Sequence, residues 1–218
     1  MNYPTYDILM PSIPHRYEGL CFLLDELDRQ MQPNVGVRIF YDNLACPVGR
    51  KYHILAHSSK ASYISVLEDD DMISPNFIDT INEALLSRPD YVGFKVHWTH
   101  DGAPQIPVEH SLKHKEWTIY DGTNTVLYRD INQFNPMKRE LALLGEYEGH
   151  PPNGKAWDWH WSQGVRASGK VKTEVFIPEI MHYYRTKSAD TFMTPRTPWP
   201  ENEIPAVPKY DWLTEVSR

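Results

Sequence analysis

The sequence predicts an α/β fold with a mostly parallel central sheet flanked by helices, followed by a proline-rich C-terminal arm. In the N-terminal half, short apolar runs alternate with segments whose apolar residues recur at helical spacing. This alternation is typical of parallel strands joined by right-handed crossover helices. The chain of 218 residues, with 41% hydrophobic and 23% charged residues, is long and apolar enough for one substantial core.

Four strands and three helices account for the N-terminal half. The strands are predicted at residues 6–11, 35–43, 63–67 and 91–96. Each is a run of apolar or β-branched residues bounded by prolines or polar residues. The helices are expected over residues 17–31 and 49–60 and after Ser74 and Pro75, which form an N-cap and first-turn pair. Their expected inward residues are Leu20, Leu23, Leu24, Leu27 and Met31; Ile54 and Leu55; and Phe77, Ile78, Ile81, Ala84 and Leu85.

The C-terminal half has a weaker pattern between residues 97 and 153. The segment 123–131 predicts a strand, residues 155–169 predict a helix that ends near Gly169, and residues 171–184 predict another strand. From Thr194 onward the sequence contains Pro195, Pro198, Pro200, Pro205 and Pro208. We expect this segment to lie over the domain as an extended arm, because Trp199 and Trp212 would otherwise be exposed.

Charge and cysteine content exclude several classes of protein. The formal net charge of −7 argues against a protein that holds nucleic acid by bulk electrostatics. Only two cysteines occur, and neither belongs to a CxxC pair, so no disulfide framework or metal knuckle is indicated. No signal peptide or membrane-spanning apolar segment is recognisable. A soluble, cytoplasmic protein is the expectation.

Four adjacent acids, Glu68 to Asp71, follow the third predicted strand in the sequence "SYISVLEDDDMISPNF". Clustered carboxylates repel one another unless something compensates their charge. A helix N-terminus beyond them accounts for one or two. A hard divalent cation, Mg²⁺ or Mn²⁺, explains the cluster better, since it accepts one or two carboxylates and completes its shell with water and phosphate oxygens. The ends of the first two strands, "PSIPHR" and "YDN", should meet the acids at the same edge of the sheet.

These stretches together resemble family 2 glycosyltransferases of the GT-A fold. The central segment "VGRKYHILAHSSKASYISVLEDDDMISPNF" resembles the family's basic helix, Tyr-Ile strand, DxD-type acid motif and proline-containing helix start. The segments "ILMPSIPHR" and "VRIFYDN" resemble its first two strands. "AWDWHWSQGVRASGKV" resembles its acceptor-side helix, and "HYYRTKSADT" resembles the C-terminal stretch that returns to the diphosphate. The resemblance implies one GT-A domain over residues 1–193, with a nucleotide-sugar half (1–96) and an acceptor half (97–193), before the arm (194–218).

The resemblance also implies roles for individual residues. Asp70 would bind the metal, Asp42 would hydrogen-bond the base, Asp69 would contact the ribose or a basic neighbour, and Asp71 would contact the sugar. Glu68 stands where the family often has Asp. The remaining expected nucleotide-sugar contacts are Pro11, Ser12, Ile13 and Arg16, with Arg50 or Lys51 facing the diphosphate or base.

Asp158 is the implied catalytic base, although this chain has Trp157-Asp158 where the family commonly has Glu-Asp. Trp157 and Trp161 share a helical face and could stack on an acceptor, although such residues are more often core. Either His182 binds the metal, or Arg185 and Lys187 neutralise the diphosphate instead.

The implied activity is a metal-dependent, inverting transfer of a sugar from a nucleoside-diphosphate sugar, most commonly a UDP-sugar, to a hydroxyl acceptor. The acceptor could be a glycan, a protein or a hydroxymethylated DNA base. A Mg²⁺-dependent nucleotidyltransferase remains an alternative, although "PSIPHR" lacks the glycine-rich loop typical of that class. A non-catalytic sugar- or nucleotide-binding module is the third interpretation.

Overall fold

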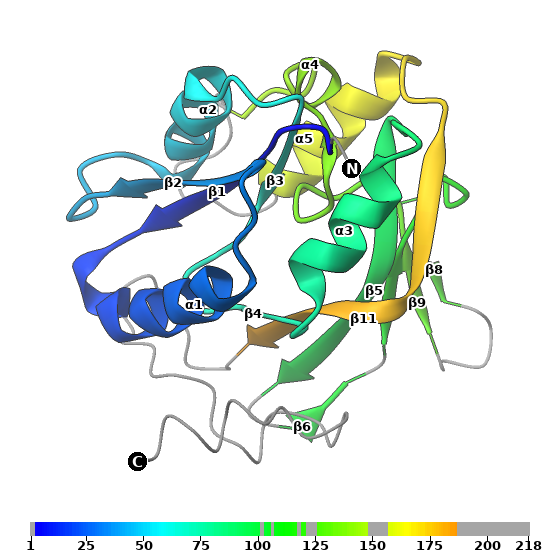
Figure 1. Cartoon of the computed structure of the whole chain (residues 1–218). Coiled ribbons are helices and arrows are strands. Elements are labelled where there is room, and N and C mark those ends of the chain that lie inside the picture. Colours follow the sequence, from blue (N-terminus) through cyan, green and yellow to red (C-terminus); the bar gives the residue numbers. More distant parts are fainter. Residues whose placement is uncertain are drawn as a thin grey trace.

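The computed structural model describes residues 3–100, 103–105, 107–116, 119–120, 126–147 and 157–186. One twisted sheet runs through the molecule, and helices pack on both of its faces (Figure 1). The predicted α/β class with flanking helices is confirmed. The expected C-terminal arm, with Trp199 and Trp212, lies outside the described residues.

The long strands pair in parallel, as predicted. Strand β1 (Tyr6–Ser12) lies between β2 (Val35–Tyr41) and β3 (Tyr63–Val66), and β5 (Tyr91–His100) pairs with β11 (Glu174–Thr186). The short strands are β4 (Met72–Ile73), β6 (Ala103–Pro104), β7 (Val108–His110), β8 (Ile119–Tyr120), β9 (Leu127–Arg129) and β10 (Met137–Lys138). The order along the sheet is β2-β1-β3-β10-β5-β7-β9-β8. The two-residue strand β10 lies antiparallel between β3 and β5.

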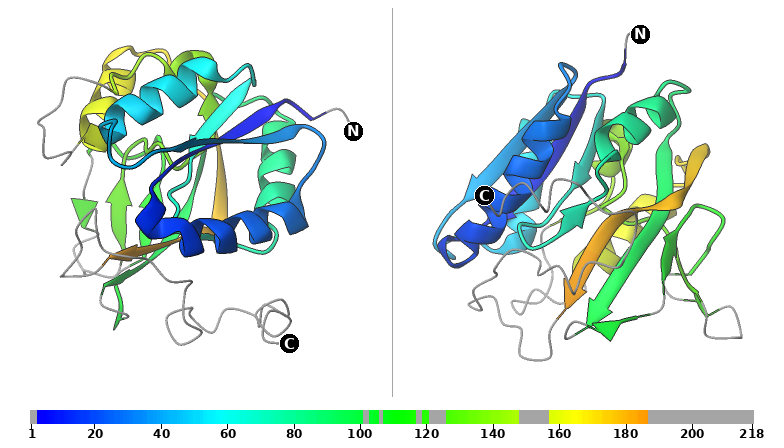
Figure 2. Two further views of the ribbon diagram at one scale, coloured as in Figure 1. Left: turned by 90° about the vertical axis from the view of Figure 1, so that its left-hand side faces the viewer. Right: turned by 60° about the horizontal axis from the view of Figure 1, so that its bottom comes forward.

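Strand β11 connects the two halves of the molecule. It follows β5 from Glu174 to Thr186, and near its end it also pairs antiparallel with β4, so that His182 lies opposite Ile73 (Figure 2). Its register shifts between Ile177 and Ile180, around Pro178, as expected at a bulge, because proline cannot donate to a ladder. This pairing places the C-terminal strand directly beside the segment that carries the four acids.

The helices occur close to their predicted positions. They are the 3₁₀ turn η1 (Pro14–Arg16) and the α-helices α1 (Tyr17–Gln30), α2 (Val48–Ser58), α3 (Phe77–Leu85), α4 (Arg139–Ala142) and α5 (Trp157–Ala167). Helix α3 begins at Phe77 with Asn76 as its N-cap, rather than at Ser74 and Pro75. The reason is that the Ser74 N–H donates to the Met181 carbonyl at 3.0 Å, which holds Ser74 in the β4–β11 ladder.

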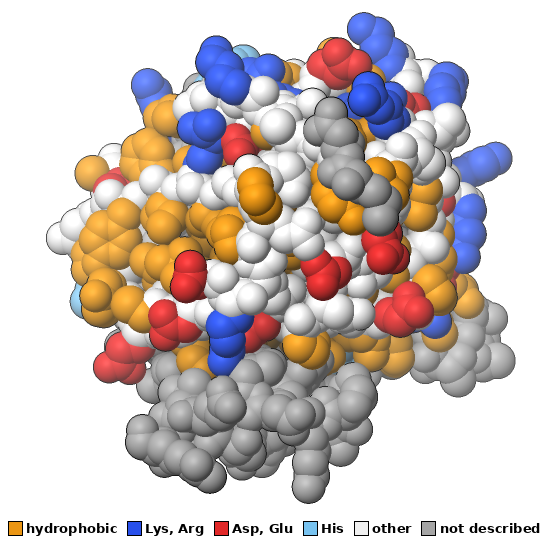
Figure 3. Space-filling model, in the orientation of Figure 1, with side chains coloured by type: hydrophobic (Ala, Val, Ile, Leu, Met, Phe, Trp, Pro, Cys, Tyr) orange, Lys and Arg blue, Asp and Glu red, His pale blue; other side chains and the backbone are white. Residues whose placement is uncertain are grey.

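Charged side chains are dispersed over the face seen in Figure 3, with Lys and Arg at its upper and right margins and Asp and Glu across its lower half. This distribution agrees with the moderate negative net charge of −7. Within the described part of the chain, none of the helices combines the length and apolar character that crossing a bilayer would require.

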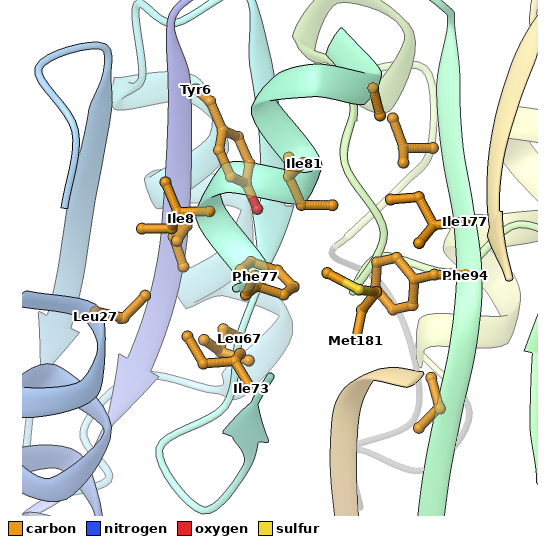
Figure 4. Packing of buried hydrophobic residues seen from close by; sticks show 14 of the residues in the cluster. Tyr6, Ile8, Leu27, Leu67, Ile73, Phe77, Ile81, Phe94, Ile177 and Met181 are labelled. Atoms are coloured by element: carbon orange, nitrogen blue, oxygen red, sulfur yellow. The ribbon is translucent and has the colours of Figure 1, made fainter. Parts of the chain in front are cut away.

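The sheet separates two apolar clusters. Helices α1 and α3 cover one face, where Ile8, Leu27, Phe77 and Ile81 pack together (Figure 4). Helices α2, α4 and α5 supply residues to the cluster that contains Leu9 of β1. Two of the residues predicted to lie in the core are exposed, so the prediction was wrong for them. Met31 is 39% exposed because it follows the last turn of α1, and Ile54 is 38% exposed because it lies one position from the inward Leu55.

Candidate active site

The four acids form a buried turn between β3 and β4. The Asp71 N–H donates to the Glu68 carbonyl at 3.1 Å and closes the turn. Asp69, Asp70 and Asp71 are at most 5% exposed, while Glu68 is half-buried. Carboxylates concentrated in this way need positive charge or hydrogen-bond donors around them. We call residues 68–71 the acid turn.

Arg16 supplies positive charge to the acid turn from η1, directly after β1. Its Nη1 lies 3.0 Å from Asp69 Oδ1 and 3.4 Å from Asp70 Oδ1. Burial on its own would lower the pKa of Arg16, but the carboxylates of Asp70, Asp69 and Glu68 outweigh it and raise that pKa. The predicted meeting of the first strand end with the acids is therefore present in the structure.

His182 reaches the acid turn from β11. Its Nε2 lies 2.9 Å from Asp71 Oδ2. The ring of Phe134 packs edge-on against the imidazole with 4.8 Å between centroids. Within the described residues, Asp71 Oδ1 and His182 Nδ1 are buried without a hydrogen-bond partner, so both remain available to a ligand.

Burial raises the pKa values of Glu68, Asp69 and Asp71 in the acid turn, because it removes water from around their carboxylates. Burial, together with Asp70 and Asp71, raises the pKa of Glu68 to about 8, although the Tyr52 hydroxyl donates to Glu68 Oε1 at 2.8 Å. Burial raises the pKa of Asp69 to about 6 against the opposing effect of Arg16. Burial also raises the pKa of Asp71, while His182 lowers it. Perturbed carboxylates of this kind are typical of functional sites.

A second charged group lies where β1 and β2 end. Asp42 forms an ion pair with Lys51 of α2, and the Cys46 N–H donates to Asp42 Oδ2 at 2.7 Å. The Lys51 ammonium also donates to the Ser12 carbonyl at 3.3 Å. Burial tends to raise the pKa of Asp42, but these donors lower it overall. Lys51 is buried, whereas the neighbouring Arg50 is exposed on α2.

The end of β1 connects this ion pair to the acid turn. Pro11, Ser12 and Ile13 are buried there, and the Asp42 N–H donates to the Ser12 carbonyl at 3.4 Å. The structure therefore brings the predicted residues of the first three strands to one edge of the sheet.

Asp158 lies in the first turn of α5. Burial raises its pKa, whereas the N–H of Trp159, which donates to Asp158 Oδ1 at 2.9 Å, and the charge of Arg129 lower it. Asp158 and the acid turn both influence the pKa of Tyr184 on β11. Burial raises the pKa of Tyr184, and Glu68, Asp71, Asp70 and Asp158 all act on it in the same direction. Asp158 and three residues of the acid turn therefore all act on the same side chain of β11.

Trp161 is not placed as an acceptor-stacking residue. Its side chain is 1% exposed, packs against Tyr147, and donates its indole N–H to the Ala142 carbonyl at 3.0 Å. A ring enclosed in this way has no free face for a sugar, so the expectation for Trp161 is corrected to a core role. The Trp157 side chain and Lys187 lie outside the described residues, and Arg185 is buried on β11.

Three residues at the site were not identified from the sequence. Tyr52 bonds Glu68, Tyr184 lies among the carboxylates, and Arg129 of β9 acts on Asp158. Tyr184 belongs to the quoted stretch "HYYRTKSADT", but no pattern distinguished it from Tyr183. Among the residues that the structure describes, no three His, Cys, Asp or Glu side chains converge as a metal-binding group.

Comparison with solved structures relates this architecture to TarS of S. aureus, a family 2 glycosyltransferase of the GT-A fold. TarS 1-349 matches with a TM-score of 0.57 and 10% identity over 83% of this chain and 60% of that one. Its complex with UDP-GlcNAc matches with a TM-score of 0.53 and 9% identity, and its complex with UDP with 0.55 and 10%. These two matches cover 86% and 84% of this chain, and 60% of each TarS chain.

The likeness establishes the fold. The protein has a GT-A-type fold, as the sequence predicted, and spans 60% of the length of these TarS chains. Neither the models of known protein families nor the curated proteins contain a match to the sequence.

Proposed function

We propose that this protein is a glycosyltransferase that moves a sugar from a nucleoside-diphosphate sugar to a hydroxyl acceptor. One observation carries the proposal: at the carboxyl edge of the parallel strands, the buried acid turn contacts Arg16 and His182, and the Asp42–Lys51 pair lies at the end of β1, where Lys51 bonds the Ser12 carbonyl. Ligands of doubly wound sheets bind at this edge. The TarS complexes with UDP-GlcNAc and UDP support the same class of donor, and we propose a UDP-sugar.

The donor would lie along the ends of β1 and β2. Asp42 would accept a hydrogen bond from the base, and the buried strand end at Pro11, Ser12 and Ile13 would form the wall beside it. Arg16 would face the nucleotide, with Lys51 and Arg185 offering further positive charge to the phosphates. Asp69 would accept from the ribose and Asp71 from the transferred sugar.

The acid turn fits a divalent cation, Mn²⁺ or Mg²⁺. Asp70 and His182 are the proposed ligands, and Asp71 Oδ1 is a buried acceptor without a partner among the described residues. Four carboxylates are faced there by Arg16 and His182, which leaves negative charge for a cation to offset. Mg²⁺ and Mn²⁺ take one or two carboxylates from the protein when substrate phosphates and water complete the shell. When bound, the ion would supply Lewis-acid stabilisation of the diphosphate charge.

Asp158 would act as the base of an inverting transfer. Its carboxylate would take the proton of the acceptor hydroxyl while the acceptor oxygen forms its bond to the anomeric carbon. The bond from that carbon to the phosphate oxygen would break on the opposite face, and the nucleoside diphosphate would leave with the bonding electrons. The remaining residues would contribute by holding donor and acceptor in line.

Thermal-shift measurements with UDP-sugars, in the presence and absence of MnCl₂, test the proposal. A ligand at 100 times its Kd stabilises the folded state by about 2.7 kcal/mol, so a productive donor should raise the Tm by several degrees. Asp70→Asn should remove the Mn²⁺-dependent part of the shift, and of any turnover, while the fold survives.

Asp25→Asn is the matched control, because Asp25 is exposed on α1 and its substitution also removes one negative charge. It should behave as the wild type. Turnover that persists in Asp70→Asn would show that the metal assignment is wrong. If none of the nucleotide sugars shifts the Tm of the wild type, the proposed function itself is wrong.

A further inference from the structure

Trp159 presents an indole to solvent directly beside the proposed base. Its side chain is 40% exposed, whereas Trp161, two residues later, is in the core. Residues two positions apart in an α-helix point about 200° apart, so Trp161 faces the core while Trp159 lies on the nearly opposite side of α5. A large rigid apolar ring gains more from contact with a ligand than most exposed side chains do.

The indole is held in place by its neighbours. The ring of His160 meets it edge-on, with centroids 4.8 Å apart and an interplanar angle of 74°. The Trp159 N–H donates to Asp158 Oδ1 at 2.9 Å, so the base and the backbone of Trp159 are joined by a hydrogen bond. The contact with His160 restricts the rotation of the indole, which reduces the conformational freedom that a ligand packing on it would remove.

We infer that Trp159 is the stacking platform for a saccharide acceptor, an inference that rests on the proposed function. An acceptor hydroxyl must come within about 3 Å of the Asp158 carboxylate to lose its proton. Trp159 follows Asp158 in the first turn of α5 and its indole is exposed, so we place the ring of an acceptor that reaches Asp158 against this indole. The apolar C–H face of a pyranose would cover the exposed indole, while its equatorial hydroxyls would remain in water or reach Asp158.

Charge favours a neutral saccharide over a nucleic acid. An extruded base could also stack on Trp159. Its flanking phosphates, however, would approach the Asp158 carboxylate on a protein with a net charge of −7. A sugar without charge brings no such repulsion.

The test compares the full-length wild type with Trp159→Ala and Trp159→Phe. Leu86→Ala is the matched control, because it truncates an apolar side chain of similar exposure, 43%, at the end of α3. The probes are methyl glycosides of glucose, galactose, mannose and N-acetylglucosamine, with an oligothymidylate as the nucleic-acid arm. Binding is measured by saturation-transfer NMR in the presence of UDP, and donor binding by the thermal shift with UDP-sugars.

We expect Trp159→Ala to weaken glycoside binding about tenfold, because stacking on an aromatic ring contributes at that level, whereas Trp159→Phe should retain most of it. For any glycoside that is a substrate, Trp159→Ala should raise the acceptor KM more than it lowers kcat, and Trp159→Phe should restore most of the KM. A purely structural role for Trp159 would instead lower kcat and the thermal shift with UDP-sugars together, and Trp159→Phe would not selectively restore the KM.

Three results would overturn the inference. Trp159→Ala could bind glycosides as the wild type does, the wild type could bind none of the glycosides, or the oligothymidylate could bind in their place and depend on Trp159. Each leaves the proposed function intact as long as UDP-sugars shift the Tm of the wild type. Loss of that donor shift identifies failure of the proposed function instead.

Discussion

Arg16 is the residue on which the charge balance of the acid turn depends most directly. One guanidinium contacts both Asp69 and Asp70, and these aspartates are almost completely buried. Removing one partner of a buried ion pair leaves the other charge uncompensated, which costs more than the pair contributes when intact.

We expect Arg16→Gln to lower the free energy of unfolding by about 3 kcal/mol in metal-free buffer, the cost of an uncompensated buried carboxylate. MnCl₂ should restore part of this loss, because a cation at the acid turn would replace the missing charge. Urea denaturation with and without MnCl₂ measures both effects. Arg38→Gln serves as the control, since its partner Asp7 is buried but Arg38 is partly exposed and distant from the turn. Equal stability of Arg16→Gln and wild type would contradict this account.

Asp158 should give transfer a distinctive pH dependence. Burial raises its pKa, so the carboxylate that accepts the proton is populated only at a higher pH than for an exposed aspartate. The transfer rate should rise with pH until Asp158 is ionised and then level off. Asp158→Asn should abolish this rise and lower the rate by about 10²–10⁴-fold. Steady-state rates between pH 4 and 9 measure it, and a slope that survives in Asp158→Asn would assign the base elsewhere.

The raised pKa of Asp158 also affects the stability of the fold, which it lowers as pH rises, whereas the transfer rate should increase. The folded state holds the Asp158 proton more tightly than the unfolded state, so this group lowers stability as pH rises through its folded pKa. Asp158→Asn should therefore unfold at a higher temperature than wild type at pH 8. The difference should vanish at low pH, where Asp158 is protonated in both states. Differential scanning calorimetry at the two pH values distinguishes this effect from a general change in packing.

At the scale of elements, Asp90 connects three segments at the start of β5. Its carboxylate accepts from Lys138 Nζ of β10 at 2.8 Å and from the N–H groups of Lys172 and Thr173, ahead of β11, at 2.8 and 3.0 Å. Burial tends to raise the pKa of Asp90, but these donors lower it overall. The group therefore stabilises the fold above its unfolded pKa, and this stabilisation is lost as pH falls through the folded pKa.

We expect Asp90→Asn to lower the free energy of unfolding by about 1–3 kcal/mol at pH 7, because a partly buried charged acceptor is replaced by an amide that cannot satisfy all three donors. The difference should shrink below about pH 4, where wild-type Asp90 is protonated in the unfolded chain. Denaturant titrations at pH 7 and pH 3 measure it. A difference that stays constant with pH would indicate a steric cause.

The long elements could be predicted from the sequence because each has a sustained pattern. Helix α1 keeps Leu20, Leu23 and Leu27 on its buried stripe, and β3 is a continuous apolar run. Strands β4 and β10 have two residues each, which is too short for any periodicity to emerge. Their existence depends on tertiary partners, β11 for β4 and both β3 and β5 for β10.

The sequence predicted those residues of the candidate site that come shortly after the ends of strands. The acid turn, Arg16, Asp42 and Lys51 meet because the first three strands are parallel. The roles of the three tryptophans of α5, Trp157, Trp159 and Trp161, could not be separated in this way, because the ring that packs against Trp161, that of Tyr147, lies outside the helix. Tyr184 was missed because the carboxylates that act on it come from the acid turn and α5, which are distant from it in sequence.

For the molecule as a whole, the position of each strand in the sheet predicts how its amides should exchange with solvent. Strand β5 has β11 along one side and β7 and β10 along the other. Among the described strands, β2 pairs with β1 alone and β8 with β9 alone. Amides in β5 should exchange slowest and those in β2 and β8 much faster, because edges open without global unfolding.

Hydrogen–deuterium exchange followed by mass spectrometry checks this ranking. Adding UDP with MnCl₂ should slow exchange further in the acid turn and in β11 near His182, while leaving α3 unchanged. Protection of β2 equal to that of β5 would indicate that another chain covers this edge in solution.

The ladder between β4 and β11 has a consequence for biogenesis. Ser74 and Met181, which contact each other through Oγ and Sδ at 3.8 Å, are separated by 107 positions in the sequence. A ribosome adding about 5–20 residues per second therefore needs several seconds between releasing the first and the second. Throughout that interval the acid turn of the nascent chain lacks His182. The proposed site should therefore be completed only after β11 has left the ribosome, when the N-terminal strands are already available to fold.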